Sequence, residues 1–256
     1  MRLSTRLYAL ALSAAVASPA GAQSSTNDHF VTDMVKALKD PARWSLSGNV
    51  AASRTEPYLL QTTELGERAV RAKRGVAWGL GTGFDVGDKL GLRLGYSYTN
   101  SNMEFRDFNG TGSDLLDVED IGKLKTNIAS LDVVHYFVGS RSLISPYAGA
   151  GVAGVWSGLG PQGDFLATPG GSQQFHWGLD ASVGVQVRVI EKLFGRAEWA
   201  TTGSHNPFNG NRSYRAVNGV NIDEPTRISK TEWRLAATYY FGTPATQPTV
   251  TATKTQ

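Results

Sequence analysis

Charged side chains recur at alternate positions within segments that are otherwise apolar or rich in glycine. The set contains four arginines and five carboxylates: Asp85, Arg93, Asp132, Asp180, Arg188, Arg196, Glu198, Glu232 and Arg234. Buried ions are costly unless they are paired, and this near balance of signs suits pairing. We therefore predict a network of ion pairs inside the protein. The arginines are expected to pair with Asp132, Asp180, Glu198 and Glu232, although the sequence leaves the individual partners open.

A hydroxyl and an imidazole stand side by side at Ser204 and His205, in the stretch GSHNP. A serine nucleophile needs its base within hydrogen-bonding reach on the same face of the protein. Neighbouring residues of a strand point to opposite faces, and Pro207 places this pair next to a loop. A polar loop tip explains the pair better than a catalytic site, so we expect no catalytic residues.

Carboxylates in the polar stretch 100–123 offer a third kind of chemistry. They are Asp114, Asp117, Glu119 and Asp120. Ca²⁺ prefers such oxygen ligands, but a solvated acidic loop has the same composition. The other histidines have no spacing typical of a metal site: His29, His135 and His176. The runs GLGTG and GAGVAG open no helix, unlike phosphate-binding loops. We expect neither a metal nor a cofactor.

The charged residues lie on segments in which apolar and polar residues alternate, as is typical of β-strands. Eight such segments are present: residues 43–53, 75–87, 89–99, 127–138, 144–156, 175–190, 193–201 and 227–241. The connections between them alternate between long polar stretches and short turns. This arrangement predicts an all-β fold, an eight-stranded antiparallel up-and-down β-barrel.

Alternate residues of each strand form an apolar set and a polar set, which we call the two phases of the strand. The phase that faces inward distinguishes a soluble barrel from a membrane barrel. A soluble barrel of the lipocalin type would turn its apolar phase inward. Here the polar phase combines ions with glycines, which suits the narrow, filled interior of eight strands. All six tryptophans are in the apolar phase: Trp44, Trp78, Trp156, Trp177, Trp199 and Trp233. We expect Trp44 and Phe241 at the short-turn end and the other tryptophans towards the long loops, as at the two interfaces of a membrane. The sequence thus predicts a transmembrane barrel.

The two ends of the chain have patterns of their own. Residues 1–22 contain a basic start, an apolar run and Ala20-Gly21-Ala22, which is typical of a cleaved signal peptide. Residues 23–42 are predicted as a periplasmic lead-in with a short amphipathic helix. The barrel is expected to occupy residues 43–241, and residues 242–256 form a Thr/Pro-rich stretch predicted to be disordered.

Composition excludes several classes of function. The chain has no cysteine, so it can form neither a disulfide nor a thiolate metal site. Its formal net charge is +3, and loss of Arg2 and Arg6 with the signal peptide would leave it close to neutral. Such a charge gives no reason to expect binding of nucleic acid.

The strands resemble the small outer-membrane β-barrel family, which includes the transmembrane domain of outer membrane protein A and the opacity-type porin family. The resemblance covers residues 43–241 and rests on SPYAGAGVAG, DASVGVQVRV, RAEW and WRLAATYYF. It implies an outer-membrane location, contact with outer-membrane lipid and lipopolysaccharide, and recognition of the final aromatic, Phe241, by the barrel assembly machinery. The family's final aromatic is often the last residue, whereas here GTPATQPTVTATKTQ follows.

The expected role is that of an integral outer-membrane protein of Gram-negative type, with a structural or surface-interaction function and a largely closed, ion-paired lumen. The long loops would carry any extracellular ligand. Two alternatives stay open. A wet, continuous polar column would make the protein a narrow porin-like channel. A similarity to lipid A deacylase would make it a lipid-modifying enzyme that uses Ser204 and His205.

Overall fold

The computed structural model describes residues 40, 43–63, 66–108, 115–161, 174–206 and 226–242. Their strands are β1 (Trp44–Thr55), β2 (Leu59–Thr63), β3 (Gly66–Ala72), β4 (Gly75–Asp85), β5 (Leu90–Phe108), β6 (Leu115–Tyr136), β7 (Ile144–Pro161), β8 (Gln174–Ile190), β9 (Leu193–His205) and β10 (Arg227–Tyr240). The predicted signal peptide, lead-in helix and tail lie outside the described residues, apart from Asp40 and Gly242. Within the described ranges no helix is long and apolar enough to cross a membrane.

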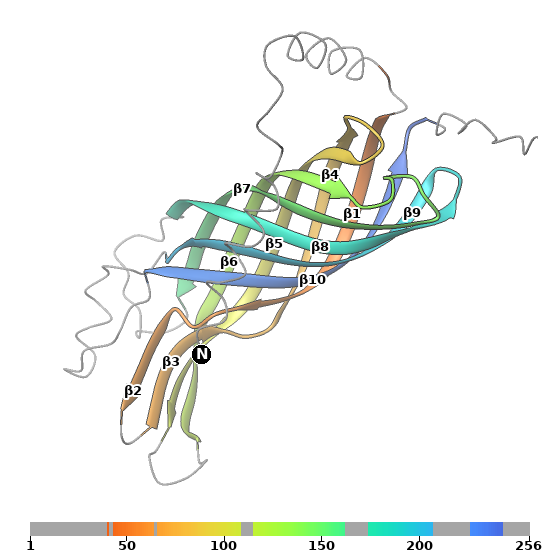
Figure 1. Ribbon diagram of the computed structural model, residues 1–256. Helices are drawn as coiled ribbons and strands as arrows, with labels where there is room; N and C mark the ends of the chain where they lie inside the picture. Colours follow the sequence, from red (N-terminus) through yellow and green to blue (C-terminus); the bar gives the residue numbers. More distant parts are fainter. Residues whose placement is uncertain are drawn as a thin grey trace, which may run out of the picture.

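Eight of the strands form a closed antiparallel barrel, as predicted (Figure 1). Around the ring they follow the order β1, β4, β5, β6, β7, β8, β9 and β10. The pairing of β10 with β1 closes it, with Ser45 opposite Tyr240. Closure gives the amide and carbonyl groups of every barrel strand a partner, which a strand-built membrane protein requires. We call the end with the turns 86–89, 137–143 and 191–192 the short-turn end, and the opposite end the long-loop end.

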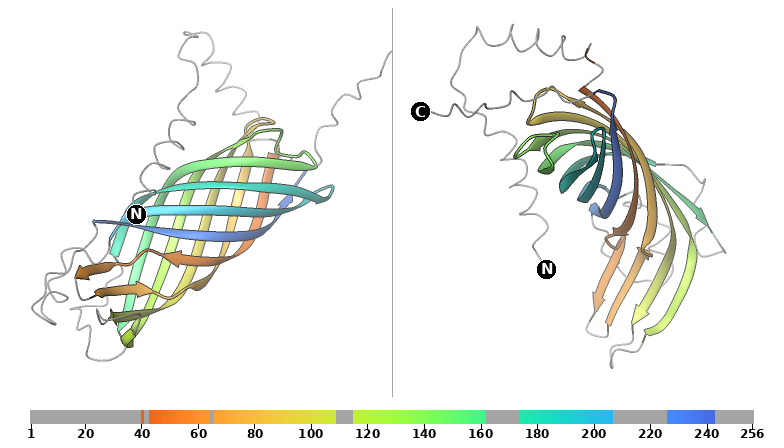
Figure 2. Two further views of the ribbon diagram at one scale, coloured as in Figure 1. Left: turned by 60° about the horizontal axis from the view of Figure 1, so that its bottom comes forward. Right: turned by 90° about the vertical axis from the view of Figure 1, so that its right-hand side faces the viewer.

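Strands extend beyond the barrel where only polar connections were expected. The stretch 54–73 contains the β2–β3 hairpin, and β3 pairs with the far part of β5. Strands β5 and β6 are 19 and 22 residues long and pair as far as Phe108 and Leu115. Together they form a sheet that projects from the long-loop end (Figure 2). The expectation of loops was wrong here. Strands outside the membrane can pair through their main chains without an apolar face, so this part of the sheet lacks the alternation by which the membrane strands were predicted.

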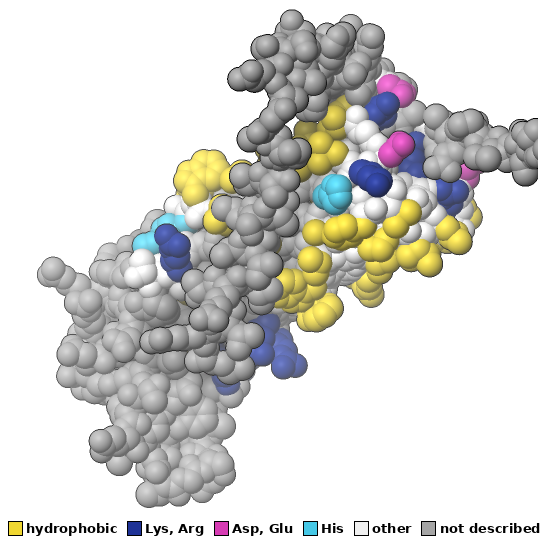
Figure 3. All heavy atoms as spheres, in the orientation of Figure 1, with side chains coloured by type: hydrophobic (Ala, Val, Ile, Leu, Met, Phe, Trp, Pro, Cys, Tyr) yellow, Lys and Arg dark blue, Asp and Glu magenta, His cyan; other side chains and the backbone are white. Residues whose placement is uncertain are grey.

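The apolar phase of the barrel strands is on the outside. Leu235 and Val183 are 64% and 51% exposed, whereas Glu198, in the other phase, is 5% exposed. On the face seen in Figure 3, hydrophobic side chains form a band along the lower right of the described barrel wall. A soluble protein rarely leaves so large a contiguous apolar surface in water. The surface therefore suits contact with hydrocarbon.

Outward aromatic rings lie in groups towards both ends of the barrel. At the short-turn end the Trp44 and Phe84 rings are 5.1 Å apart, and the Phe241 amide donates to the Trp44 carbonyl at 3.1 Å. The remaining tryptophans lie in neighbouring pairs on the outer wall: Trp78 with Tyr98, Trp156 with Phe175, Phe175 with Trp177, and Trp199 with Trp233. Trp177 is 72% exposed, and its amphipathic ring suits a membrane–water interface.

Candidate functional site: the charged interior

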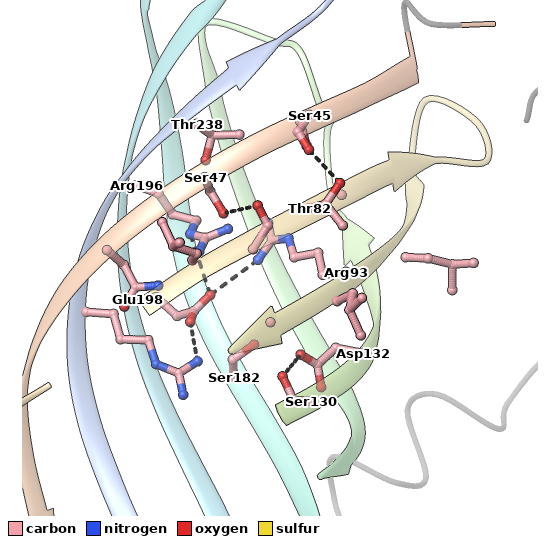
Figure 4. Close-up of a pocket in the computed structure, with 18 of the residues that line it drawn as sticks. Ser45, Ser47, Thr82, Arg93, Ser130, Asp132, Ser182, Arg196, Glu198 and Thr238 are labelled. Carbon is pink, nitrogen blue, oxygen red and sulfur yellow. Dashed lines mark hydrogen bonds and ion pairs between the residues drawn. The ribbon is translucent and has the colours of Figure 1, made fainter. Parts of the chain in front are cut away.

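The side chain of Glu198, on β9, is the centre of the interior. Its carboxylate accepts hydrogen bonds from Arg93 Nη1 at 3.2 Å, Arg234 Nη1 at 2.9 Å and Tyr147 Oη at 2.6 Å. Arg196 Nε lies 3.8 Å from the same carboxylate. Strands β5 and β9 are on opposite sides of the ring, so the Arg93–Glu198 pair crosses the lumen (Figure 4). The interior is thus tied together across its width.

Strand β10 continues this network towards the long-loop end. Arg234 Nε lies 2.7 Å from Glu232, and Lys230 Nζ lies 2.8 Å from the other oxygen of Glu232. Lys230 also donates to the Thr99 hydroxyl of β5 at 2.6 Å. Lys230 was not among the predicted charges, although it precedes Glu232 and Arg234 in the same phase of the strand. Its position in that alternation was the signal that could have identified it.

Aromatic rings in the polar phase complete the wall around Arg93. Its guanidinium carbon lies 4.3 Å from the centroid of the Tyr147 ring, and Nη2 donates to the Tyr136 hydroxyl at 3.1 Å. Both tyrosines are almost fully buried. A cation over an aromatic face gains further stabilisation in a desolvated site. Neither tyrosine was among the predicted interior residues, although Tyr147 shares the phase of Gly149 and Gly151 in β7.

The turn 137–143 covers the short-turn end of the interior. The Ser140 hydroxyl donates to the Asp85 carboxylate at 2.8 Å, and Arg141 Nε lies 3.6 Å from it. Gln186 of β8 donates to the Ser140 carbonyl at 2.7 Å. Asp85 therefore joins a cap at the end of the barrel, separate from the Glu198 cluster. The sequence of this turn, GSRS, did not predict that it would cap the end of the barrel.

Three of the predicted ion-pair residues make no ion pair within 4.0 Å among the described residues. Asp132 accepts a hydrogen bond from the Ser130 hydroxyl at 3.0 Å, and Asp180 accepts one from Thr202 at 2.5 Å. The Arg188 guanidinium lies 5.7 Å from the centroid of the Phe194 ring. The expected pairing of these residues was wrong, since hydroxyls and a ring contact occupy the places assigned to opposite charges.

Little free space remains around the network. A polar cavity of about 50 Å³ lies beside Arg93, Asp132 and Glu198. A volume of this size holds only a few water molecules. At the level of Glu198 the side chains thus fill the lumen, as the narrow bore of eight strands allows.

Gly184 of β8 makes room for this network, which leads to a first prediction. A Cβ there would lie 2.6 Å from both the Ala197 carbonyl oxygen and the Tyr147 hydroxyl. We expect Gly184→Ala to lower the free energy of unfolding by about 1–3 kcal/mol, because such overpacking displaces Tyr147 from Glu198. Urea titration of protein folded in lipid vesicles measures this change. Gly48→Ala is the control, because its nearest neighbour is Leu80 Cδ2 at 3.8 Å. Equal stability of the two variants would contradict this account.

The Ser204–His205 pair lacks the geometry of a nucleophile and its base. The Ser204 hydroxyl is in the buried phase and donates to the main-chain carbonyl of His205 at 3.3 Å. The exposed His205 ring lies 5.5 Å from the ring of His176. The two side chains thus lie on opposite faces of β9. The geometry does not support the deacylase alternative.

The acidic segment shows no assembled calcium site in its described part. Asp120 Oδ1 lies 2.7 Å from Lys73 Nζ, and this hydrogen bond raises the pKa of Lys73. Asp117 and Glu119 are in β6, where they pair with β5, and Asp114 lies outside the described residues. No group of three or more His, Asp or Glu suited to a metal occurs among the residues that the structure describes.

Comparison with known proteins identifies the fold. No protein-family model and no curated protein sequence matches the chain. The outer membrane protein OprG from Pseudomonas aeruginosa matches with 16% identity over 78% of this chain and 95% of that one, with a TM-score of 0.54. Neisserial surface protein A matches with 15% identity over 77% of this chain and 97% of that one, with a TM-score of 0.46. The likeness to OprG, together with the closed eight-stranded ring, shows that the chain has the fold of the small outer-membrane β-barrels.

Proposed function

We propose that this protein is an integral outer-membrane barrel with a closed lumen, and that it supports and presents the sheet at its long-loop end. The fold implies the outer membrane, and the apolar outer wall fits hydrocarbon. The observation that carries the proposal is the convergence of Arg93, Arg234 and Tyr147 on Glu198 across the lumen. Side chains that cross the bore leave no wide path for solutes at that level.

The projecting sheet of β2, β3, β5 and β6 supports the second part of the proposal. Hydrogen-bonded strands hold this sheet in a fixed relation to the barrel, because β5 and β6 are continuous from one to the other. Binding residues are often found on segments that a rigid scaffold positions. We therefore assign contact with other molecules to the long-loop end, which faces the cell exterior in this proposal.

A closed lumen predicts that the folded protein conducts no steady current in a planar lipid bilayer. Folding is verified on the same sample by the different gel mobility of boiled and unboiled protein. Arg93→Ala removes the side chain that crosses from β5 to Glu198, and we expect this variant to show small current steps. Reproducible steps from the wild-type protein would contradict the proposal and favour the narrow channel.

A further inference from the structure

Two carboxylates of the interior lie in one row of the wall, and we call them the aspartate pair. Asp132 of β6 is opposite Gly151 of β7, and Gly151 is opposite Asp180 of β8. The Cα atoms of the two aspartates are therefore roughly two strand spacings, or about 10 Å, apart. Asp132 and Asp180 are 9% and 3% exposed, so both carboxylates are removed from bulk water.

Each member of the aspartate pair has one oxygen atom without a partner. The Ser130 hydroxyl donates to Asp132 Oδ2, and the Thr202 hydroxyl donates to Asp180 Oδ1. The other two atoms, Asp132 Oδ1 and Asp180 Oδ2, are buried and have no hydrogen-bond partner in the described part of the chain. Buried polar atoms nearly always have a partner, so these two oxygens call for a ligand.

The unpartnered oxygen of Asp132 points towards the gap between the two carboxylates. A Cβ at position 151 would collide with Asp132 Oδ1, which therefore lies against Gly151, on the side of Asp132 that faces β8. Because residue 151 is a glycine, no side chain separates the aspartate pair. The gap over Gly151 is thus open to a small ligand held from both sides.

The neighbouring guanidiniums are directed at other carboxylates. Arg93 is opposite Asp132 in the pairing of β5 with β6, yet its guanidinium donates to Glu198 at 3.2 Å. Arg234 donates to Glu198 at 2.9 Å and to Glu232 at 2.7 Å. Buried charges without a compensating charge are costly. The aspartate pair therefore needs a positive charge that the described side chains do not place beside it.

Neutral oxygen atoms lie around the gap. The Ser130 and Thr202 hydroxyls already contact the carboxylates, and Ser182 follows Asp180 in the same phase of β8. Ser130, Asp132 and Ser182 line the polar cavity of about 50 Å³ (Figure 4). Carboxylates, hydroxyls and room for a few water molecules together form the set of oxygen ligands that hard cations prefer.

We propose that Asp132 and Asp180 bind a Ca²⁺ ion in the gap over Gly151. Each carboxylate supplies its unpartnered oxygen, and Ser182 and water complete a shell with ligands at about 2.3–2.6 Å. Mg²⁺ suits this site less, because it demands near-ideal octahedral geometry and gives up its water reluctantly, whereas strands fix these oxygens and leave little room for water. The bound ion neutralises the aspartate pair and links β6 to β8. The expectation of no metal rested on the histidines and on the acidic segment, and it did not consider these aspartates.

Calorimetric titration with Ca²⁺ of the chain, folded in an uncharged detergent and freed of metal with EDTA, tests the inference. We expect saturable binding by the wild type and at least about tenfold weaker binding by Asp132→Asn/Asp180→Asn, because the number of charged ligands sets the affinity of such sites. Asp117→Asn/Asp120→Asn removes the same charge from the acidic segment of β6 and should bind as wild type does. No binding by the wild type, equal affinity of the wild type and the interior variant, or loss of binding in the acidic-segment variant would overturn the inference. An affinity for Mg²⁺ equal to that for Ca²⁺ would overturn the choice of ion.

Unfolding of the wild type by urea in vesicles of uncharged lipid gives a test that does not depend on the folding of a variant. An ion that binds only the folded chain stabilises it, so millimolar Ca²⁺ should raise the urea concentration at the midpoint of unfolding. The midpoint of the Asp132→Asn/Asp180→Asn variant should not change with Ca²⁺. Without Ca²⁺ it should lie no lower than that of the wild type, because two like charges without a partner have been removed. A wild-type midpoint that is independent of Ca²⁺ would overturn the inference, whether or not the variant folds.

Discussion

Glu198→Gln is expected to lower the free energy of unfolding by about 3–5 kcal/mol, the usual cost of removing one partner from a buried ion pair. The substitution keeps the shape of the side chain but leaves Arg93, Arg196 and Arg234 without the carboxylate on which they converge. Urea titration in lipid vesicles measures the loss. Stability within about 1 kcal/mol of wild type would show that the cluster contributes no more than a surface pair.

The exposed Lys73–Asp120 pair provides the matched control for Glu198→Gln. Its side chains are 40% and 57% exposed, so Asp120→Asn should cost at most about 1 kcal/mol. A double-mutant cycle with Arg93→Met then measures the coupling across the lumen. We expect the Arg93→Met/Glu198→Gln double variant to lose less stability than the two single variants together, because removing Arg93 leaves fewer unpaired charges.

Leu235→Arg is expected to lower the free energy of unfolding in a bilayer by about 2–4 kcal/mol, as for arginine near the midplane on the lipid face of a barrel. Leu235 is 64% exposed on the outer wall and lies opposite Val50 and Ala197 in the neighbouring strands. If this barrel stood in water instead of a bilayer, the outward position 235 would face solvent, and arginine there would be tolerated. The fraction of the variant that folds in lipid vesicles measures this effect, and we expect it to be lower than that of the wild type.

The position of the arginine along the wall is the control for Leu235→Arg. Phe241 is 52% exposed and lies at the short-turn end of the same apolar phase. The cost of a charge on the lipid face falls to about 0–1 kcal/mol near the interface, so Phe241→Arg should be milder apart from the loss of its aromatic ring. Equal effects at the two positions would contradict the placement of Leu235 in the hydrocarbon.

The barrel could be predicted from the sequence because residues that face lipid are apolar, residues that face the filled lumen are polar or small, and the two kinds alternate along each strand. The stretch 175–190 shows this directly: Val183 faces outward, and Asp180 is 3% exposed inside. The alternating lengths of the connections supplied the order of the strands. The β2–β3 hairpin could not be found in this way, because a sheet beyond the membrane does not need an apolar face.

The composition of the interior was more predictable than its contacts. Alternation identified Glu198 and Arg234 as inward-facing, but ion partners depend on the register and on side chains from opposite sides of the ring. Asp180 illustrates the difference, since Thr202 of β9 is its hydrogen-bond partner and no guanidinium of the described residues lies within 4.0 Å of it. The contact of Ser140 with Asp85 depends on the path of the turn 137–143, which an alternation of apolar and polar residues does not predict.

Quenching of tryptophan fluorescence in a bilayer tests most directly which phase of the strands faces lipid. All six tryptophans lie in the outward phase of the barrel. The chain folded in vesicles should lose most of its fluorescence when the lipid chains carry bromine, and little when acrylamide is added to the water. Strong quenching by acrylamide with no effect of the brominated lipid would place the apolar phase away from the membrane and contradict the account.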